Sequence, residues 1–235
     1  MSNERGLLFV RLDIPEEEKD DWNSWYDGVH VPDRMALPGF LFAGRYTCVP
    51  GLPRDYGTEG DAGYMAIYDL ESPQVLKDKP YQAVRDKDLA QPPDSFESRI
   101  FKLPKFGRGV YRQIYPENSE YKKPTARYVF IVGHDVPDNR HEEFNAWYDT
   151  EHTPALMSVP GFLSVRRYNM VDDDPPITDT GGVLSQYLTI WELESEAVLE
   201  SEEFLNAAKS PWSDWIRSWY TRKMCVLYKR IYPEG

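Results

Sequence analysis

The stretch "WYDGVHVPDRMALPGF", from Trp25 to Phe40, has a near copy later in the same chain. The copy reads "WYDTEHTPALMSVPGF" and runs from Trp147 to Phe162. At an offset of 122 residues, positions 22–46 and 144–168 agree at 13 of 25 places. Agreement of this length indicates an internal repeat.

The likeness continues towards the ends of both copies. Further along the chain, "YMAIYDLES" matches "YLTIWELES", and each copy closes with "IYPE". The polar stretch "NSEYKKPTA" lies between the copies and is typical of a linker. We therefore expect two units, residues 1–119 and 120–235.

Each unit has a pattern typical of the order β-α-β-β-α-β. In the first unit, "GLLFVRLDI", "PGFLFAGRYTCV", "AGYMAIYDL" and "GVYRQIYP" are rich in apolar and β-branched residues, which predicts strands. "PEEEKDDWNSWYDGVH" opens with proline and acidic residues and predicts a helix, which we expect Pro32, like Pro154 in the second copy, to end. "SPQVLKDKPYQAVRDKDL" predicts another helix, broken or kinked at Pro80.

This order is the ferredoxin-like split β-α-β arrangement. Its antiparallel sheet carries helices on one face, so the other face needs a cover. The sequence therefore predicts an α+β fold in which two tandem ferredoxin-like repeats pair sheet to sheet and form a barrel within one chain. Two independent units are the alternative.

The composition restricts the class of protein. A formal net charge of −12 opposes binding to nucleic acid or to anionic membranes. The apolar runs are too short to span a bilayer, and no signal-peptide pattern is present. We expect a cytoplasmic protein that binds neither nucleic acid nor membrane, and that is a monomeric pseudo-dimer or a homodimer.

Polar residues recur on the helix of the opening stretch with the spacing i, i+4, i+7. The strip consists of Asn23, Asp27 and His30 in the first copy and of Asn145, Asp149 and His152 in the second. A helical wheel places the strip beside an apolar stripe of aromatic residues and Val29. A carboxylate can orient a histidine and raise its basicity, which suits general acid-base catalysis. The structural alternative is that these side chains brace the end of the helix.

The two copies differ next to the histidine. Glu151 stands where the first copy has Val29, and a carboxylate on an apolar face is expected to have a raised pKa. Arg34 stands where the second copy has Leu156, and an arginine there can hold an anionic substrate. The alternatives are that Glu151 faces water and that Arg34 forms a surface ion pair. We predict non-equivalent sites, with the His152 copy the more active.

The predicted site residues follow from these strips and from the aromatic residues beside them. The predicted catalytic residues are His152, Asp149, Glu151, His30 and Asp27. The predicted substrate-binding residues are Asn145, Asn23, Tyr148, Tyr26, Trp147, Trp25, Tyr187, Tyr64 and Arg34. Burial in the core is the alternative for the tryptophans and tyrosines. Arg45–Tyr46 and Arg167–Tyr168 also repeat, and neighbours on a strand point to opposite faces.

Motifs for cofactors are missing from the sequence. The four histidines form no H-x-x-x-H pair, and Cys48 and Cys225 form no C-x-x-C pattern, so we expect no metal site. Glycine-rich nucleotide motifs and the G-x-S-x-G elbow are absent too. We therefore expect no cofactor, with haem as an alternative because one histidine suffices as its axial ligand.

W-Y-D-x-x-H-x-P followed by P-G-F and R-Y resembles the dimeric α/β-barrel superfamily, near its EthD-like members, once in each half. The resemblance implies the fold described above. It does not fix a reaction, because the superfamily includes monooxygenases, isomerases, cyclases, dehydratase-like proteins and haem enzymes.

The favoured function is a cofactor-independent enzyme that acts on a small hydrophobic or aromatic metabolite. Its predicted chemistry is proton transfer by the histidine and the aspartate, as in a lyase, isomerase, dehydratase or cyclase. The alternatives are a non-catalytic small-molecule binding or accessory protein, and a haem-dependent or cofactor-free oxygenase.

Overall fold

The computed structural model describes residues 4–50, 62–117, 119–178 and 180–234. In the first half the strands are β1 (Gly6–Leu12), β2 (Phe40–Cys48), β3 (Tyr64–Leu70) and β4 (Gly107–Tyr115), and the helices are α1 (Lys19–Trp25), α2 (Val31–Met35), α3 (Lys79–Leu89) and α4 (Phe96–Arg99). In the second half the strands are β5 (Tyr128–Asp135), β6 (Phe162–Met170), β7 (Tyr187–Leu193) and β8 (Thr221–Tyr232), and the helices are α5 (His141–Trp147), α6 (Thr153–Met157), α7 (Glu202–Ala207) and α8 (Pro211–Arg217). Short 3₁₀ turns cover Glu16–Glu18, Pro73–Lys77, Ile100–Lys102 and Glu196–Glu200.

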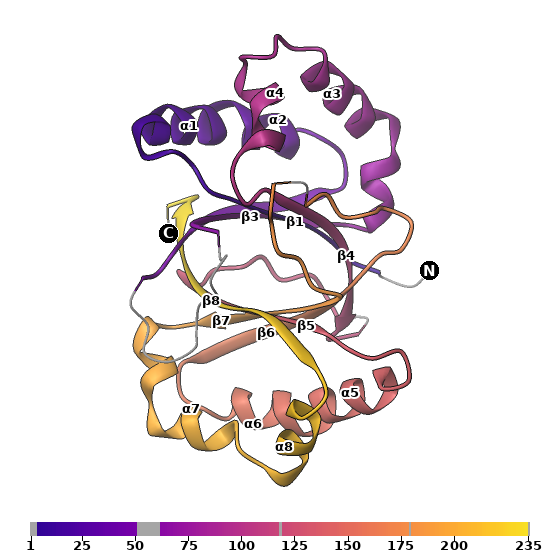
Figure 1. Cartoon of the computed structure of the whole chain (residues 1–235), viewed down its shortest axis with the longest axis vertical. Coiled ribbons are helices and arrows are strands. Elements are labelled where there is room, and N and C mark those ends of the chain that lie inside the picture. The colour runs from indigo at the N-terminus through magenta and orange to yellow at the C-terminus, as the bar shows by residue number, and fades with distance from the viewer. Residues whose placement is uncertain (1–3, 51–61, 118, 179, 235) are drawn as a thin grey trace.

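The eight strands form one closed antiparallel barrel in the order β1-β3-β2-β8-β5-β7-β6-β4. Strands from different halves join twice: β2 pairs with β8, and β4 pairs with β6. The alternative of two independent units is therefore wrong, and the predicted barrel within one chain is confirmed. The helices of the first half lie on one side of the barrel and those of the second half on the opposite side (Figure 1).

Three buried clusters follow from this architecture. One fills the barrel interior, with Leu7, Phe9 and Ile67 from the first half facing Val129, Ile131 and Leu188 from the second. The other two lie between the helices and the outer face of the sheet, one in each half. Each strand thus alternates between the barrel interior and a helix-covered face, which explains why both faces of the sheet are apolar.

The helix of the opening stretch does not end at its proline. A five-residue π turn, Tyr26–His30, connects α1 to α2, and Tyr148–His152 does the same between α5 and α6. Pro32 and Pro154 lie in the first turns of α2 and α6. The expectation that they stop the helix is wrong, because the wider π turn accommodates a residue that lacks an N–H and would crowd a regular helix. Pro80, by contrast, lies at the start of α3 after a 3₁₀ turn, as a helix break requires.

The "PGF" of each copy sets the entry into the next strand. Gly39 and Gly161 have φ angles of 83° and 92°, a region that side chains with a Cβ rarely adopt. A Cβ on Gly39 would also lie 2.5 Å from a methyl group of Val75. Glycine is therefore required at this turn by conformation and by space.

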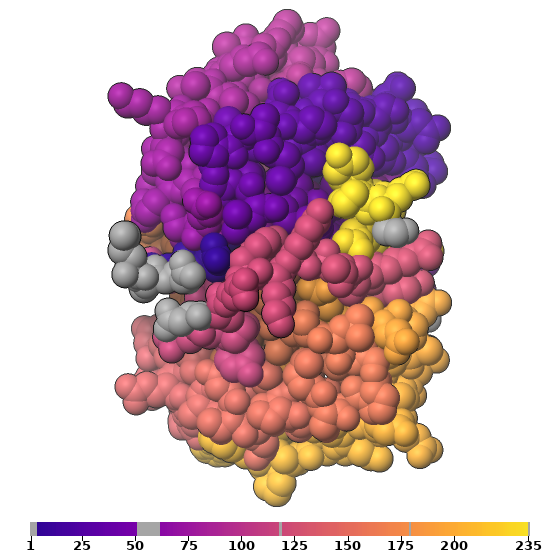
Figure 2. Space-filling model, turned by 180° about the vertical axis from the view of Figure 1, so that it is seen from behind, coloured from indigo at the N-terminus to yellow at the C-terminus, as the bar shows by residue number. Residues whose placement is uncertain are grey.

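The two halves are closely joined at the back of the molecule. Figure 2 shows the C-terminal end of β8 lying against the N-terminal half, which agrees with the pairing of Arg45 in β2 with Tyr232 in β8. No helix within the described ranges is long and apolar enough to cross a membrane.

Candidate functional site

The repeated asparagine and aspartate bind an arginine rather than the histidine. Arg45, on β2, donates a hydrogen bond from Nη1 to Oδ1 of Asp27 and one from Nη2 to Oδ1 of Asn23, both at 2.6 Å. Its guanidinium carbon lies 4.3 Å from the centre of the Tyr26 ring. The side chain of Arg45 is 3% exposed, so its charge depends on these partners.

The second half repeats this arrangement. Arg167 bonds to Asp149 and, at 2.7 Å, to Asn145, and its guanidinium carbon lies 4.1 Å from the centre of the Tyr148 ring. We call each such group of arginine, aspartate, asparagine and tyrosine the arginine clamp. The clamp corrects the prediction that the aspartate orients the histidine, because the carboxylate of each aspartate binds the arginine of the neighbouring strand.

The clamp also confirms that neighbouring residues on this strand face opposite ways. Arg45 points outward to the helix, whereas Tyr46 belongs to the barrel interior, and Arg167 and Tyr168 are divided in the same way. The repeated "RY" therefore links the helix layer to the barrel core.

Each histidine is the last residue of a π turn, and its ring lies against aromatic side chains. The His30 ring lies 4.8 Å from the centre of the Trp25 ring and 4.7 Å from that of Tyr26. Its Nδ1 is buried and has no hydrogen-bond partner among the described residues. Any proton exchanged with a molecule beside the ring must therefore pass through Nε2. Burial, together with the charges of Arg34 and Arg45, holds the pKa of His30 well below its usual value, so the ring is neutral at pH 7.

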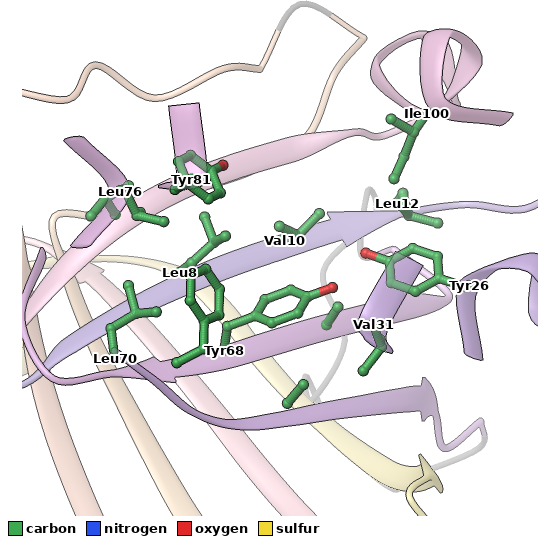
Figure 3. Packing of buried hydrophobic residues seen from close by; sticks show 14 of the residues in the cluster. Leu8, Val10, Leu12, Tyr26, Val31, Tyr68, Leu70, Leu76, Tyr81 and Ile100 are labelled. Atoms are coloured by element: carbon green, nitrogen blue, oxygen red, sulfur yellow. The ribbon is translucent and has the colours of Figure 1, made fainter. Parts of the chain in front are cut away.

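His30 lines a cavity of about 590 Å³ between the helices of the first half and the outer face of its sheet. This volume is in the range of pockets that take small molecules. Most of the wall is apolar, and Leu8 and Val10 of β1 form its floor (Figure 3). The remaining apolar and aromatic lining residues are Tyr26, Tyr68, Leu76, Tyr81, Leu89, Ile100, Phe101, Phe106, Pro175 and Ile177.

Two phenols are buried in this cavity wall. The hydroxyl of Tyr26 points towards that of Tyr68, which comes from β3 (Figure 3). The Tyr68 hydroxyl has no partner of ordinary hydrogen-bond geometry in the part of the chain that the structure describes. Burial raises the pKa of both phenols, so both stay protonated and able to donate hydrogen bonds at pH 7.

Ion pairs form the polar part of the wall. Arg34 is 8% exposed and is bonded to Asp88 of α3. This burial corrects the alternative of a surface ion pair at Arg34. Arg108 of β4 donates a hydrogen bond to Asp174 at 3.2 Å, and Asp174 comes from the segment between β6 and β7 of the second half. The cavity of the first half is thus completed by the second half.

The corresponding space in the second half is much smaller, at about 110 Å³. Trp191 fills the place of Tyr68, and Leu156 and Phe204 replace Arg34 and Tyr81. His152 lies against Trp147, with ring centres 4.4 Å apart, and burial lowers the pKa of His152 to about 3. The two spaces are therefore unequal in size, and the one beside His30 is large enough for a ligand.

The remaining predicted site residues lie outside the first-half cavity. Glu151 is half-buried and accepts a hydrogen bond from Ser210, while Val29 is 44% exposed, so neither lies on the apolar stripe expected of them. The helical wheel assumed a regular α-helix. The π turn changes the direction in which Val29 and Glu151 point, so the predicted positions of both side chains are wrong. Asn145, Asp149 and Tyr187 line a separate open hollow beside β4 and β6.

The predicted aromatic residues are divided between core and cavity. Trp25 is buried and donates a hydrogen bond to Glu97 at 3.2 Å, and Tyr64 packs at the edge of the same core. Trp147 donates to Ser213 at 3.1 Å and lines the small second-half space together with Tyr148.

Several residues of the cavity wall were not predicted from the sequence. Tyr81, Asp88 and Arg108 come from other elements than the opening helix, and Asp174 comes from the other half. Tyr68 does carry a signal in the sequence, because it repeats as Trp191 on a predicted strand and such a repeated aromatic residue can line a pocket. The others carry no local signal.

Haem does not fit the residues present. A metal-ligating histidine normally donates its second ring N–H to a carboxylate or carbonyl, which fixes its orientation. In the described chain the Nδ1 atoms of His30 and His152 have no such partner. Separately from haem, the described residues contain no group of three or more His, Cys, Asp or Glu side chains that could hold a free metal ion.

Comparison with known proteins gives the fold. No family model matches the chain, and no curated protein matches it. Among solved structures, the chain is similar to an anthrone oxidase-like protein, with a TM-score of 0.60, 11% identity, and coverage of 98% of this chain and 92% of the other. It is also similar to a mutant chlorite dismutase from Candidatus Nitrospira defluvii, with a TM-score of 0.57, 12% identity, and coverage of 98% and 92%. The fold is that of the dimeric α/β barrels.

A third similar structure is a candidate monooxygenase from Lactobacillus acidophilus, with a TM-score of 0.51, 14% identity, and coverage of 97% of this chain and 96% of the other. At these identities the likeness concerns the fold. The names of the three similar structures nonetheless overturn the expectation of a lyase, isomerase, dehydratase or cyclase. They refer to an oxidase-like protein, a chlorite dismutase and a monooxygenase.

Proposed function

We propose that the protein is a cofactor-independent oxygenase that acts on a small activated aromatic molecule in the first-half cavity. The observation that carries the proposal is the set of side chains around this apolar space: a neutral His30, two buried phenols and the guanidinium of Arg34. The names of an anthrone oxidase-like protein and a monooxygenase among the structural neighbours support it.

His30 is the base in this proposal. Its Nε2 accepts a proton from an acidic C–H or O–H group of the substrate, which leaves a carbanion or phenolate that can react with O₂. The charges of Arg34 and Arg45, which lower the pKa of His30, also stabilise the anion that forms beside it. For an activated methylene, one O₂ yields a carbonyl group and one molecule of water, so no external reductant is needed.

The buried phenols orient the substrate. Tyr26 and Tyr68 remain protonated and can donate hydrogen bonds to a substrate oxygen that gains charge in the reaction. The arginine clamp acts indirectly: it fixes Tyr26 from behind through Arg45. His30, Tyr26 and Arg34 thus retain functional roles, while Asp27 and Asn23 become positioning residues.

We infer further that the chain is a tandem fusion of two ferredoxin-like, EthD-like units, residues 1–119 and 120–235. The repeated motif, the repeated order of elements and the repeated clamp support this origin. In this proposal the second unit has lost the cavity beside its own histidine and supplies residues that complete the wall of the first-half cavity.

Oxygen consumption tests the function. With anthrone as substrate, we expect uptake of one O₂ per molecule oxidised, above the rate without protein. His30→Gln should lower this rate by about 10²-fold or more, the usual contribution of a general base. The matched variant His152→Gln should change the rate less than about threefold, because the second-half space holds no substrate.

Two outcomes would contradict the proposal. Binding of anthrone without O₂ uptake would favour the non-catalytic binding protein, and equal losses in the two histidine variants would remove the assignment of the first-half cavity.

A further inference from the structure

Arg108 lies in the wall of the first-half cavity and is largely buried there. Its side chain is 13% exposed and extends from β4, a strand paired on both sides, with β1 and with β6. In the described residues its carboxylate partner is Asp174, at 3.2 Å. The arginine is therefore a fixed cation at the edge of an apolar space.

The partner of Arg108 lies in a segment between two strands, unlike the partners of Arg34 and Arg45. Asp88, which pairs with Arg34, belongs to the helix α3, and Asp27, which pairs with Arg45, belongs to the π turn. Asp174 lies between β6 and β7, and its side chain is 23% exposed, so it can turn into water.

The backbone of this segment is anchored without the ion pair. Arg108 and Ile177 exchange two backbone hydrogen bonds, of 2.8 and 2.9 Å, and Ile177 packs against the first-half core. Loss of the Asp174 contact would therefore leave the guanidinium with Tyr81 and without a carboxylate partner, and would not release the wall.

The lining of the cavity lacks the excess of negative charge that the whole chain has. Four cationic side chains and three acidic ones line it, whereas the whole chain has a formal net charge of −12. The cationic residues are Arg34, Lys77, Arg85 and Arg108, and the acidic ones are Asp88, Asp173 and Asp174. Cys225 replaces Arg108 in the second half when the two "IYPE" ends are aligned, so the cation belongs to the larger cavity.

We propose that Arg108 binds the carboxylate of an aromatic acid in the first-half cavity, with Asp174 as a competitor that this carboxylate displaces. A guanidinium can hold a carboxylate through two parallel hydrogen bonds, which Asp174 supplies only in part. The ring system would lie on Leu8, Val10 and the tyrosines. The inference deepens the proposed function by naming its substrate class, but binding alone can test it.

Calorimetric titration with 2-naphthoate and its neutral isostere 2-naphthamide tests the proposal. We expect 2-naphthoate to bind the wild-type protein at least tenfold more tightly than 2-naphthamide. Arg108→Gln should abolish this preference, and Asp174→Asn should increase the affinity for 2-naphthoate about threefold or more without changing that for 2-naphthamide.

Glu16→Gln is the matched control for charge. It also removes one negative charge, from an ion pair with Lys19 outside the cavity wall, and should leave both affinities unchanged. Equal binding of the two probes, or equal effects of Asp174→Asn and Glu16→Gln, would overturn the inference. Because Asp174→Asn keeps every backbone contact, the test stands even if Arg108→Gln does not fold.

Failure of the inference is distinguishable from failure of the proposed function. Preferential binding of 2-naphthoate without O₂ uptake from anthrone would leave the inference standing and refute the oxygenase. O₂ uptake that depends on His30, together with no preference for 2-naphthoate, would refute only the inference.

Discussion

His30 and His152 occupy the same position in two copies of one motif, yet their surroundings decide different roles. Both rings are neutral because burial lowers the pKa of each. His30 faces a space large enough for a substrate, whereas His152 is enclosed by Trp147 and Trp191. At the scale of the residue, the difference comes from side chains on other elements, such as Trp191 of β7 in the place of Tyr68 of β3.

The neutral histidines make the folded state sensitive to acid. His152 has a pKa of about 3 when folded and about 6.5 when unfolded. Between these values the unfolded chain binds a proton that the folded chain does not, so stability falls as the pH falls below about 6.5. His30 and His134 have the same direction of shift.

We therefore expect His152→Gln to reduce the stability lost on going from pH 7 to pH 5 by about 2 kcal/mol. Urea unfolding of both proteins at the two pH values measures this difference. An unchanged pH dependence in the variant would show that His152 is not buried as a neutral ring.

At the scale of the element, the arginine clamp joins each π turn to the strand beside it. A buried guanidinium that loses its carboxylate is left with an uncompensated charge. Asp27→Ala would do this to Arg45, leaving Asn23 as its side-chain oxygen partner.

We expect Asp27→Ala to lower the free energy of unfolding by about 2 kcal/mol, less than for a fully buried pair because the Asp27 side chain is 31% exposed. Asp20→Asn, at an exposed position on the same helix, should change stability by less than about 0.5 kcal/mol. Denaturant unfolding measures both, and equal effects would mean that the clamp contributes no stability.

At the scale of the whole molecule, each half supplies the edges that the other half needs. Without the second half, β2 would lose its pairing with β8 and β4 its pairing with β6. The interior face that includes Leu7 and Phe9 would also become exposed to water. Unpaired edges and an uncovered apolar face favour association.

We expect the excised segment 1–119 to form dimers or larger species, and to recover a one-to-one complex when mixed with segment 120–235. Size-exclusion chromatography with light scattering measures the masses. A stable monomer of either segment, unaffected by the other, would refute the mutual dependence of the halves.

The sequence by itself determined the repeat, the order of strands and helices, and the outward and inward faces of β2, because these depend on local periodicity. It also pointed to His30, Tyr26 and Arg34 as members of one site. Only the tertiary structure decided that Asp27 pairs with Arg45, that the space beside His30 is larger than the one beside His152, and that Asp174 meets Arg108 from 66 residues away. The physical reason is that ion pairs and cavities arise between elements distant in the chain, where packing decides which side chains meet.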